Sequence, residues 1–138
     1  MKAANTAAFF YIRKLRMKNV LIVEDDDVLR SILIEHFTER LGFTSADYAA
    51  DGAEGLIRTR DTKYDVICLD HNMPYMTGME ILEVIRKKEG PNQNTPVIMI
   101  SSHLPELDDE NGSHVYYLRK PIEVKRIDRY VKMILENL

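Results

Sequence analysis

The chain has 138 residues, of which 45% are hydrophobic and 30% charged, and its formal net charge at pH 7 is −3. This size fits one domain with a real hydrophobic core and leaves no room for a second domain. The single cysteine excludes a disulfide framework and any multi-cysteine metal site, and the four histidines lack metal-ligand spacing. No apolar run approaches the roughly 20 residues of a membrane-spanning helix. We therefore expect a cytoplasmic domain without a transmembrane segment.

The charge is unevenly distributed along the chain. Residues 1–18 contain five basic side chains and no acidic one, so residues 19–138 carry the other 14 basic side chains and all 22 acidic ones. An acidic body argues against direct nucleic-acid binding, which requires Lys and Arg to displace counterions from phosphates. It is compatible with a bound divalent cation or a basic protein partner.

Residues 1–17 form an N-terminal extension whose role the sequence leaves open. Its apolar patch, Ala7–Ile12, precedes most of its basic residues, which is the reverse of the order in a secretory signal. A flexible tail, an expression artefact or an upstream start explains it, and Met17 is a natural alternative start. The other interpretation is a short amphipathic helix that contacts a partner or an acidic membrane surface. We predict a flexible extension followed by one domain over residues 18–138.

Short apolar runs predict the strands. Each has about four residues, nearly all apolar, as in strands that are buried on both faces of a parallel sheet. These runs are Val20–Val23, Val66–Leu69, Val97–Ile100 and Val115–Leu118, with Thr44–Tyr48 as a weaker candidate.

The segments between these runs have helical periodicity. The predicted apolar faces are Val28, Leu29, Ile32, Leu33 and Phe37, ending near Gly42; Met79, Leu82 and Ile85, between Gly78 and Gly90; and Val124, Ile127, Val131, Ile134 and Leu138. A short helix is expected at Gly52–Arg60. The alternation of strand and helix predicts an α/β fold with a five-stranded parallel sheet and helices on both faces.

Polar side chains follow the predicted strands. Glu24–Asp27 follow the first strand, Asp70 the third, Ser101 and Ser102 the fourth, and Arg119–Pro121 the fifth. Because the carboxyl ends of parallel strands meet at one edge, where ligands collect in open α/β sheets, we expect these groups to gather there.

Crowded carboxylates repel one another unless a cation neutralises them. Mg²⁺ suits oxygen ligands and keeps open positions for a phosphate. A carboxylate beside such an ion can attack phosphorus and form an acyl phosphate, with charge neutralisation by the metal, a lysine and a hydroxyl. These residue types favour phosphoryl transfer to an aspartate.

With these groups in view, residues 18–138 resemble the receiver domain of two-component response regulators, of the chemotaxis-type single-domain form. The matching segments are residues 20–26 (VLIVEDD), 64–74 (YDVICLDHNMP), 76–80 (MTGME), 96–102 (PVIMISS) and 117–121 (YLRKP). The resemblance implies a doubly wound, flavodoxin-like sheet with strand order 2-1-3-4-5.

The resemblance also implies roles for the acidic cluster. Asp70 corresponds to the phospho-acceptor. Glu24 and Asp25, with Asp70 and the backbone carbonyl of Asn72, correspond to the ligands of Mg²⁺ or Mn²⁺. Lys120 corresponds to the lysine that pairs with the phosphoryl oxygens.

Further residues correspond to the family's switch. Ser101 stands at the hydroxyl that moves to the phosphate, and Tyr117 at the aromatic that turns inward with it, although a plain core aromatic is the alternative for Tyr117. The Asn72 side chain and His103 stand at positions that tune the lifetime of the phosphoryl group. The Lys120-Pro121 bond is a candidate cis peptide.

One segment departs from the family pattern. Between Ser101 and Lys120 the chain is shorter than usual and contains Pro105 and the acidic run Asp108–Glu110 without an apolar stripe. We therefore expect the fourth helix to be short or irregular. This leaves open how the domain signals and whether it forms a homodimer.

The resemblance implies a signalling domain that catalyses only its own phosphorylation and dephosphorylation. Its phosphoryl group would come from a phosphohistidine on a histidine kinase or phosphotransfer protein, and the phosphorylated form would control a downstream protein. The chain would be either a stand-alone regulator or a receiver from a larger protein such as a hybrid kinase. One alternative is a pseudo-receiver that mediates association without phosphorylation. An aspartate-nucleophile phosphatase is disfavoured, because Asn72 occupies the position of its second acid.

Overall fold

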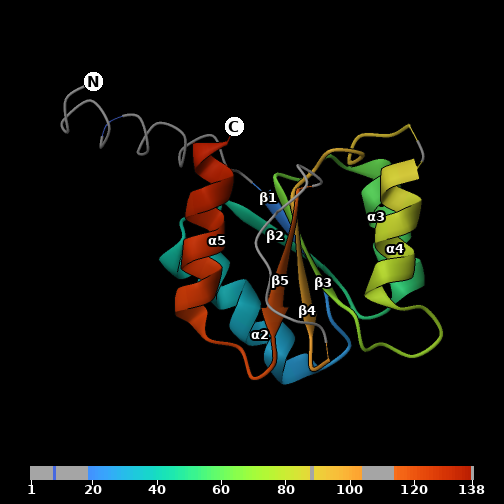
Figure 1. The fold of residues 1–138 in the computed structure, drawn as a ribbon, viewed down its shortest axis with the longest axis horizontal. Coiled ribbons are helices and arrows are strands. Elements are labelled where there is room, and N and C mark those ends of the chain that lie inside the picture. The colour runs from blue at the N-terminus through green and yellow to red at the C-terminus, as the bar shows by residue number, and fades with distance from the viewer. Residues whose placement is uncertain (1–7, 9–18, 88, 104–113, 138) are drawn as a thin grey trace.

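A computed structural model describes residues 8, 19–87, 89–103 and 114–137. Five parallel strands form a single sheet in the order β2-β1-β3-β4-β5 (Figure 1). The strands are β1 (Asn19–Val23), β2 (Ser45–Ala49), β3 (Val66–Asp70), β4 (Val97–Ser101) and β5 (Val115–Arg119). This confirms the predicted strands to within one residue at each end, as well as the implied strand order.

Helices cover both faces of the sheet. They are α2 (Asp27–Glu35), α3 (Gly52–Asp61), α4 (Gly78–Lys87) and α5 (Val124–Glu136). Helices α2 and α5 lie on one face, and α3 and α4 on the other (Figure 1). A π-helical turn, His36–Arg40, extends α2. The predicted irregular fourth helix would fall within residues 104–113, which lie outside the described residues, as does the N-terminal extension apart from Ala8.

The core has two halves, one on each side of the sheet. In β1, Val20 and Ile22 belong to the cluster packed under α2 and α5, whereas Leu21 and Val23 belong to the cluster under α3 and α4. Successive side chains of a strand point to opposite faces, so a strand covered on both sides needs apolar residues at every position. This explains the continuous apolar runs in the sequence.

Two of the predicted helix faces need correction. Val28 and Ile32 are 70% and 49% exposed, whereas Leu33 and Phe37 of the same predicted face are buried as predicted. The sheet contacts only a narrow stripe of α2, so residues one position away from that stripe face the solvent. In α5, Val124 is likewise 42% exposed, and Leu138 lies outside the described residues.

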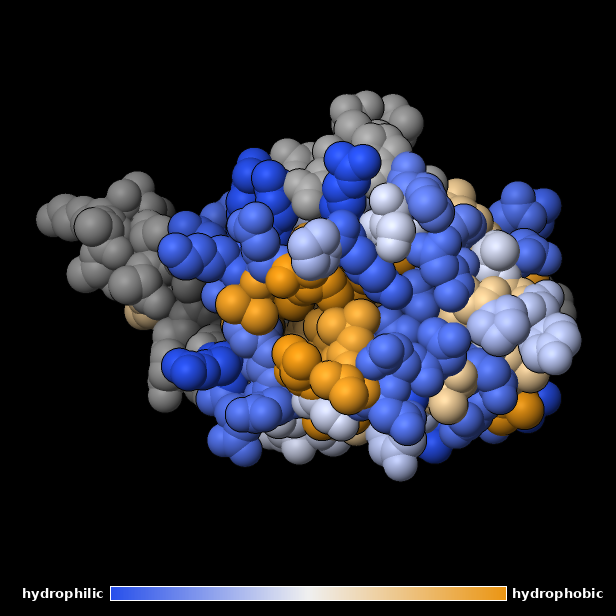
Figure 2. Space-filling view, turned by 90° about the horizontal axis from the view of Figure 1, so that it is seen from below, coloured by the Kyte–Doolittle hydropathy of each residue, from blue (hydrophilic) through white to orange (hydrophobic). Residues whose placement is uncertain are grey.

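These exposed residues lie at the end of the molecule where the strands deliver their polar groups. Seen from that end, apolar surface gathers over the beginnings of α2 and α5 (Figure 2). We call Val28, Ile32 and Val124 the apolar rim. Within the part of the chain that is described, no helix combines the length and apolar character needed to cross a bilayer.

Candidate functional site

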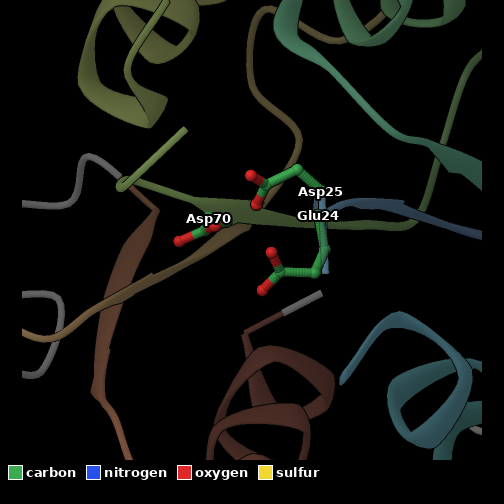
Figure 3. Close-up of side chains that lie close together, drawn as sticks. All are labelled: Glu24, Asp25 and Asp70. Atoms are coloured by element: carbon green, nitrogen blue, oxygen red, sulfur yellow. The ribbon is translucent and has the colours of Figure 1, made fainter. Parts of the chain in front are cut away.

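Three carboxylates meet at the carboxyl edge of the sheet. Asp70 is the last residue of β3, and Glu24 and Asp25 directly follow β1. One oxygen from each carboxylate lies within 4.8 Å of the others (Figure 3). Glu24 and Asp70 are each 1% exposed, whereas Asp25 is exposed. The strand register creates this cluster, because β1 and β3 pair directly and end at the same level.

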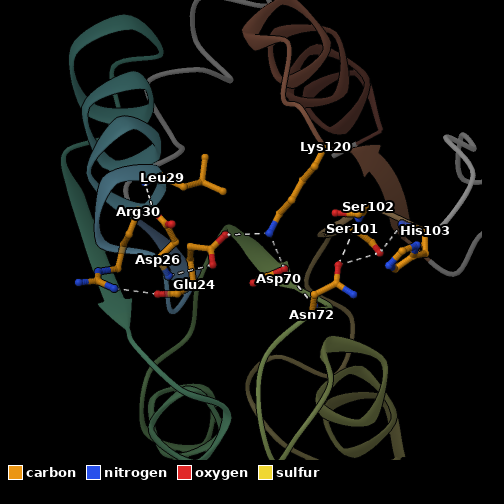
Figure 4. A network of polar contacts seen from close by, with 10 residues as sticks. All are labelled: Glu24, Asp26, Leu29, Arg30, Asp70, Asn72, Ser101, Ser102, His103 and Lys120. Carbon is orange, nitrogen blue, oxygen red and sulfur yellow. Dashed lines mark hydrogen bonds and ion pairs between the residues drawn. The ribbon is translucent and has the colours of Figure 1, made fainter.

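The two oxygens of Asp70 have different surroundings. Oδ1 accepts a hydrogen bond from the Lys120 ammonium at 3.0 Å and another from the Asn72 backbone N–H at 3.0 Å (Figure 4). Oδ2 is buried without a hydrogen-bond partner. The Lys120 Nζ also lies 3.5 Å from Glu24 Oε1, which likewise has no hydrogen bond. One lysine thus bridges two carboxylates and leaves one buried oxygen on each without a donor.

The two buried acids, Glu24 and Asp70, have pKa values shifted in opposite directions. Burial, followed by the neighbouring Asp70, raises the pKa of Glu24 to about 8. Burial also acts to raise the pKa of Asp70, but the neighbouring Glu24 carboxyl, the Asn72 N–H and the Lys120 ammonium outweigh it and lower this pKa. The pKa of Lys120 is raised because its contacts with Asp70 and Glu24 outweigh its own burial. At neutral pH the site therefore holds an ionised Asp70, a charged Lys120 and a mostly protonated Glu24.

These residues fit a hard divalent cation. The donors are all carboxylate oxygens, the ligand type that Mg²⁺ and Mn²⁺ prefer. The unpartnered Asp70 Oδ2 and Glu24 Oε1 are two buried acceptor oxygens that a bound cation would satisfy. Asp25 adds a third carboxylate from the solvent side.

Local contacts hold the loop after β1 in place. Asp26 caps α2 by accepting a hydrogen bond from the Leu29 N–H at 2.8 Å, and its own N–H donates to Glu24 Oε2 at 3.2 Å. Arg30 donates to the Glu24 carbonyl at 2.8 Å, and its guanidinium lies 5.3 Å from the centre of the Tyr48 ring. The sequence analysis did not identify Arg30, whose only local signal was its i,i+3 spacing from Asp27.

Gly78 allows the loop after β3 to close tightly on the strand. A Cβ at this position would lie 2.8 Å from the Asp70 carbonyl oxygen and 2.7 Å from the Met99 sulfur. Thr77 and Glu80 start α4 with a reciprocal pair of side-chain-to-backbone hydrogen bonds at 3.2 Å each. The absence of a side chain at Gly78 thus lets the first turn of α4 pack directly on the backbone of Asp70.

A second polar group connects the ends of β3 and β4. The Ser101 hydroxyl, fully buried, donates to Asn72 Oδ1 at 3.1 Å and accepts from the His103 N–H at 3.1 Å. The Ser102 N–H also donates to Asn72 Oδ1, at 3.2 Å. Asn72 therefore contacts Asp70 through its backbone and Ser101 through its side chain (Figure 4).

The other candidate residues occupy distinct places. Tyr117 is half-buried and packs against the core under α3 and α4, and its carbonyl accepts a hydrogen bond from the Tyr130 hydroxyl at 2.6 Å. The side chain of His103 is exposed. The Lys120-Pro121 peptide is cis, as the resemblance implied. Burial raises the pKa of the Cys68 thiol within β3, in line with a core role.

A fold with three carboxylates, a lysine and a buried hydroxyl at one sheet edge matches a known family. The family model described as the response regulator receiver domain matches residues 20–132. The chain belongs to this family. Its members are signalling domains of two-component systems, so the implied class is confirmed.

Curated relatives contain this domain in different settings. The uncharacterized transcriptional regulatory protein YcbL of Bacillus subtilis is 32% identical over 85% of this chain and 50% of its own length. The hybrid signal transduction histidine kinase G of Dictyostelium discoideum is 31% identical over 85% of this chain and 4% of its own length. Chemotaxis protein CheY of Pseudomonas aeruginosa is 28% identical over 86% of this chain and 97% of its own. The chain thus spans half or less of the first two relatives and nearly all of the third.

Solved structures share the fold. The receiver domain of the Francisella response regulator 1452 is 31% identical with a TM-score of 0.70, covering 87% of this chain and 98% of that one. A chain from the complex of histidine kinase ThkA with response regulator TrrA is 28% identical with a TM-score of 0.70, covering 86% and 99%. The receiver domain of the Pseudomonas aeruginosa sensor kinase PA1611, solved with magnesium in its active-site cleft, is 24% identical with a TM-score of 0.71, covering 86% and 98%.

Proposed function

We propose that this receiver domain accepts a phosphoryl group on Asp70 from a phosphohistidine, with Mg²⁺ or Mn²⁺ bound, and thereby switches between two conformations. The observation that carries the proposal is the state of Asp70. Its carboxylate is ionised and anchored through Oδ1, Oδ2 has no hydrogen-bond partner, and the carboxylate belongs to a cluster with Glu24 and Asp25. An anchored carboxylate with one uncommitted oxygen is arranged as a nucleophile.

In the proposed step, an Asp70 oxygen forms a bond to phosphorus as the bond between phosphorus and the donor imidazole nitrogen breaks. The imidazole keeps the electron pair of that bond, and an acyl phosphate forms on Asp70. Lys120, 3.0 Å from Asp70 Oδ1, is placed to pair with the incoming phosphoryl oxygens. The Ser101 hydroxyl would bind another of these oxygens after the transfer.

We propose that Glu24, Asp25, Asp70 and the backbone carbonyl of Asn72 hold the cation. When bound, it would neutralise negative charge on the carboxylates and on the phosphoryl oxygens. The PA1611 receiver domain, with its magnesium, supports this only by analogy of fold. The side chains of Asn72 and His103, at the mouth of the site, would adjust how long the phosphoryl group persists.

The proposed donor is a histidine kinase or a histidine phosphotransfer protein. The ThkA–TrrA complex shows that a relative associates with a kinase. In this chain the apolar rim supports such docking. Val28 and Ile32 are exposed on α2, within eight residues of Glu24 in the chain, and the exposed Val124 follows Lys120 by four residues. A surface beside the acceptor would place the donor imidazole over Asp70. We propose the cytoplasm as the compartment, because ATP supplies the phosphoryl group of such donors there.

The test is intact-mass spectrometry after incubation with acetyl phosphate and Mg²⁺. We expect one phosphoryl adduct on the wild type that requires the cation and disappears in Asp70→Ala. The exposed acid Asp51 provides a matched control, and Asp51→Ala should retain the adduct. A folded wild type without any adduct would favour a pseudo-receiver, whereas an adduct that survives in Asp70→Ala would refute Asp70 as the nucleophile.

A further inference from the structure

The Ser101 hydroxyl has one proton, and the structure directs that proton away from the acceptor. Ser101 Oγ donates to Asn72 Oδ1 at 3.1 Å and accepts from the His103 N–H at 3.1 Å. Ser101 directly follows Ile100, which pairs with Asp70 in the sheet. The hydroxyl is therefore close to the phosphoryl position along the sheet edge, but its donor capacity is committed elsewhere.

We propose that the Asn72 side chain is a latch that holds Ser101 in the unphosphorylated conformation. This proposal rests on the proposed function and concerns the regulation of the same site. A hydroxyl with one proton cannot donate to Asn72 Oδ1 and to a phosphoryl oxygen on Asp70 at the same time. Each phosphorylation must therefore break the bond from Ser101 to Asn72, and the strength of that bond sets part of the switching equilibrium.

The latch opens at low cost to Asn72. Its Oδ1 also accepts the Ser102 N–H at 3.2 Å, so it keeps one partner when Ser101 turns away. Its backbone N–H, which donates to Asp70 Oδ1 at 3.0 Å, need not move. Asn72 thus acts as a positioning residue through Ser101, separately from the backbone carbonyl that we assign to the cation.

The latch can be tested without any ligand by NMR. In the wild type, the three-bond couplings of Ser101 should report a single side-chain rotamer, because both the donor and the acceptor function of its hydroxyl are engaged. In Asn72→Ala the couplings should shift toward the averaged values of several rotamers. Couplings that stay at the wild-type values in Asn72→Ala would overturn the latch, whatever the phosphorylation chemistry of the domain.

The second test measures the affinity for beryllofluoride, a mimic of the phosphoryl group, at saturating Mg²⁺. Removing the latch should tighten beryllofluoride binding about threefold to tenfold in Asn72→Ala, the equivalent of one hydrogen bond. In a Ser101→Ala background the same substitution should have no effect, since no hydroxyl remains to be released. Ser102→Ala is the matched control, because Ser102 contacts Asn72 through its backbone N–H, which the substitution keeps. The beryllofluoride affinity of Ser102→Ala should equal that of the wild type.

The outcomes separate the latch from the proposed function. Equal effects of Asn72→Ala with and without Ser101 would refute the latch and leave phosphorylation of Asp70 intact. A wild type that fails to bind beryllofluoride would count against the proposed function, and the NMR couplings would still decide the latch. A large loss of Mg²⁺ affinity in Asn72→Ala without beryllofluoride would show that the substitution acts on the cation site instead, and it would overturn the latch.

Discussion

At the scale of single residues, the site is defined by how one ammonium is shared between two buried carboxylates. Lys120 lies 3.0 Å from Asp70 and 3.5 Å from Glu24, and this single positive charge cannot offset two negative ones in a buried setting. The result is a protonated Glu24 beside an ionised Asp70. This asymmetry leaves Asp70 with the negative charge that the proposed attack on phosphorus requires.

The raised pKa of Glu24 predicts how stability depends on pH. A carboxyl group with a pKa of about 8 in the folded protein and 4.5 in the unfolded chain stabilises the fold fully below pH 4.5. That contribution is lost as the pH rises toward 8, because the unfolded chain releases the proton first. Without divalent cations, the free energy of unfolding should therefore fall between pH 5 and pH 8 in the wild type, and much less in Glu24→Gln.

Urea unfolding in EDTA at a series of pH values measures this effect. The difference between wild type and Glu24→Gln isolates Glu24 from the histidines, which both proteins share. Exposed Glu83 provides the control, and Glu83→Gln should follow the wild-type curve. Parallel curves for wild type and Glu24→Gln would contradict the raised pKa. Added Mg²⁺ should stabilise the wild type more at pH 8 than at pH 6, because binding displaces the Glu24 proton.

At the scale of elements, helix α2 combines a buried stripe with an exposed apolar surface. In α2, the stripe of Leu33 and Phe37 contacts the sheet, while Val28 and Ile32 remain exposed. The π-helical turn at His36–Arg40 ends this helix, and Phe37 within it stacks edge-on against Phe43 with ring centres 5.1 Å apart. The exposed apolar face therefore coexists with a well-packed helix.

The apolar rim gives a prediction that separates docking from chemistry. Ile32→Asp places a charge on the exposed face of α2, where it should not unfold the helix but should disrupt an apolar contact with a protein donor. We expect phosphotransfer from a phosphorylated histidine kinase to slow at least tenfold, while phosphorylation by acetyl phosphate stays within twofold of the wild type.

Both rates can be measured by separating the phosphorylated from the unphosphorylated protein on phosphate-affinity gels. Ile57, 51% exposed on α3 on the opposite face of the sheet, offers a matched control, and Ile57→Asp should leave both rates unchanged. Equal slowing with both donors in Ile32→Asp would mean that the substitution damages the acceptor site, and the rim would lose its assigned role.

At the scale of the whole molecule, the described residues form a hydrophobic core with two halves, one on each side of the sheet. Every described buried apolar residue lies between Val20 and Leu135, on one or the other side of the sheet. The family model covers nearly the same range, residues 20–132. Residues 1–16 precede both ranges.

Removal of residues 1–16 tests this division of the chain. We expect a protein that begins at Met17 to unfold at the same temperature, within about 2 °C, and to be phosphorylated by acetyl phosphate at the same rate. Differential scanning calorimetry and the mass assay measure both. A clearly lower unfolding temperature would mean that the apolar patch Ala7–Ile12 packs on the domain, and the predicted boundary at residue 18 would be wrong.

The amino-acid sequence by itself determined the architecture and the location of the site. Continuous apolar runs identify strands covered on both faces, and the polar residues that follow them must meet at one edge because parallel strands end together. Asp70, Glu24, Asp25 and Lys120 could be predicted for this reason. Most of the predicted faces of α2 and α5 are buried, but Val28, Ile32 and Val124 were assigned to them incorrectly, because periodicity shows that a stripe exists but not how wide the sheet beneath it is.

Only the tertiary structure decided which polar atoms form hydrogen bonds and which have no partner. The donation of the Ser101 proton to Asn72, at 3.1 Å, joins residues 29 positions apart in the chain. The contact of Arg30 with the Glu24 carbonyl and the unpartnered Asp70 Oδ2 likewise depend on how the loops fold at the sheet edge. Hydrogen bonds and pKa values depend on direction and burial, which no spacing in the sequence encodes. The sequence thus determined which groups assemble at the sheet edge, and the folded arrangement decided how protons and charges are distributed among them.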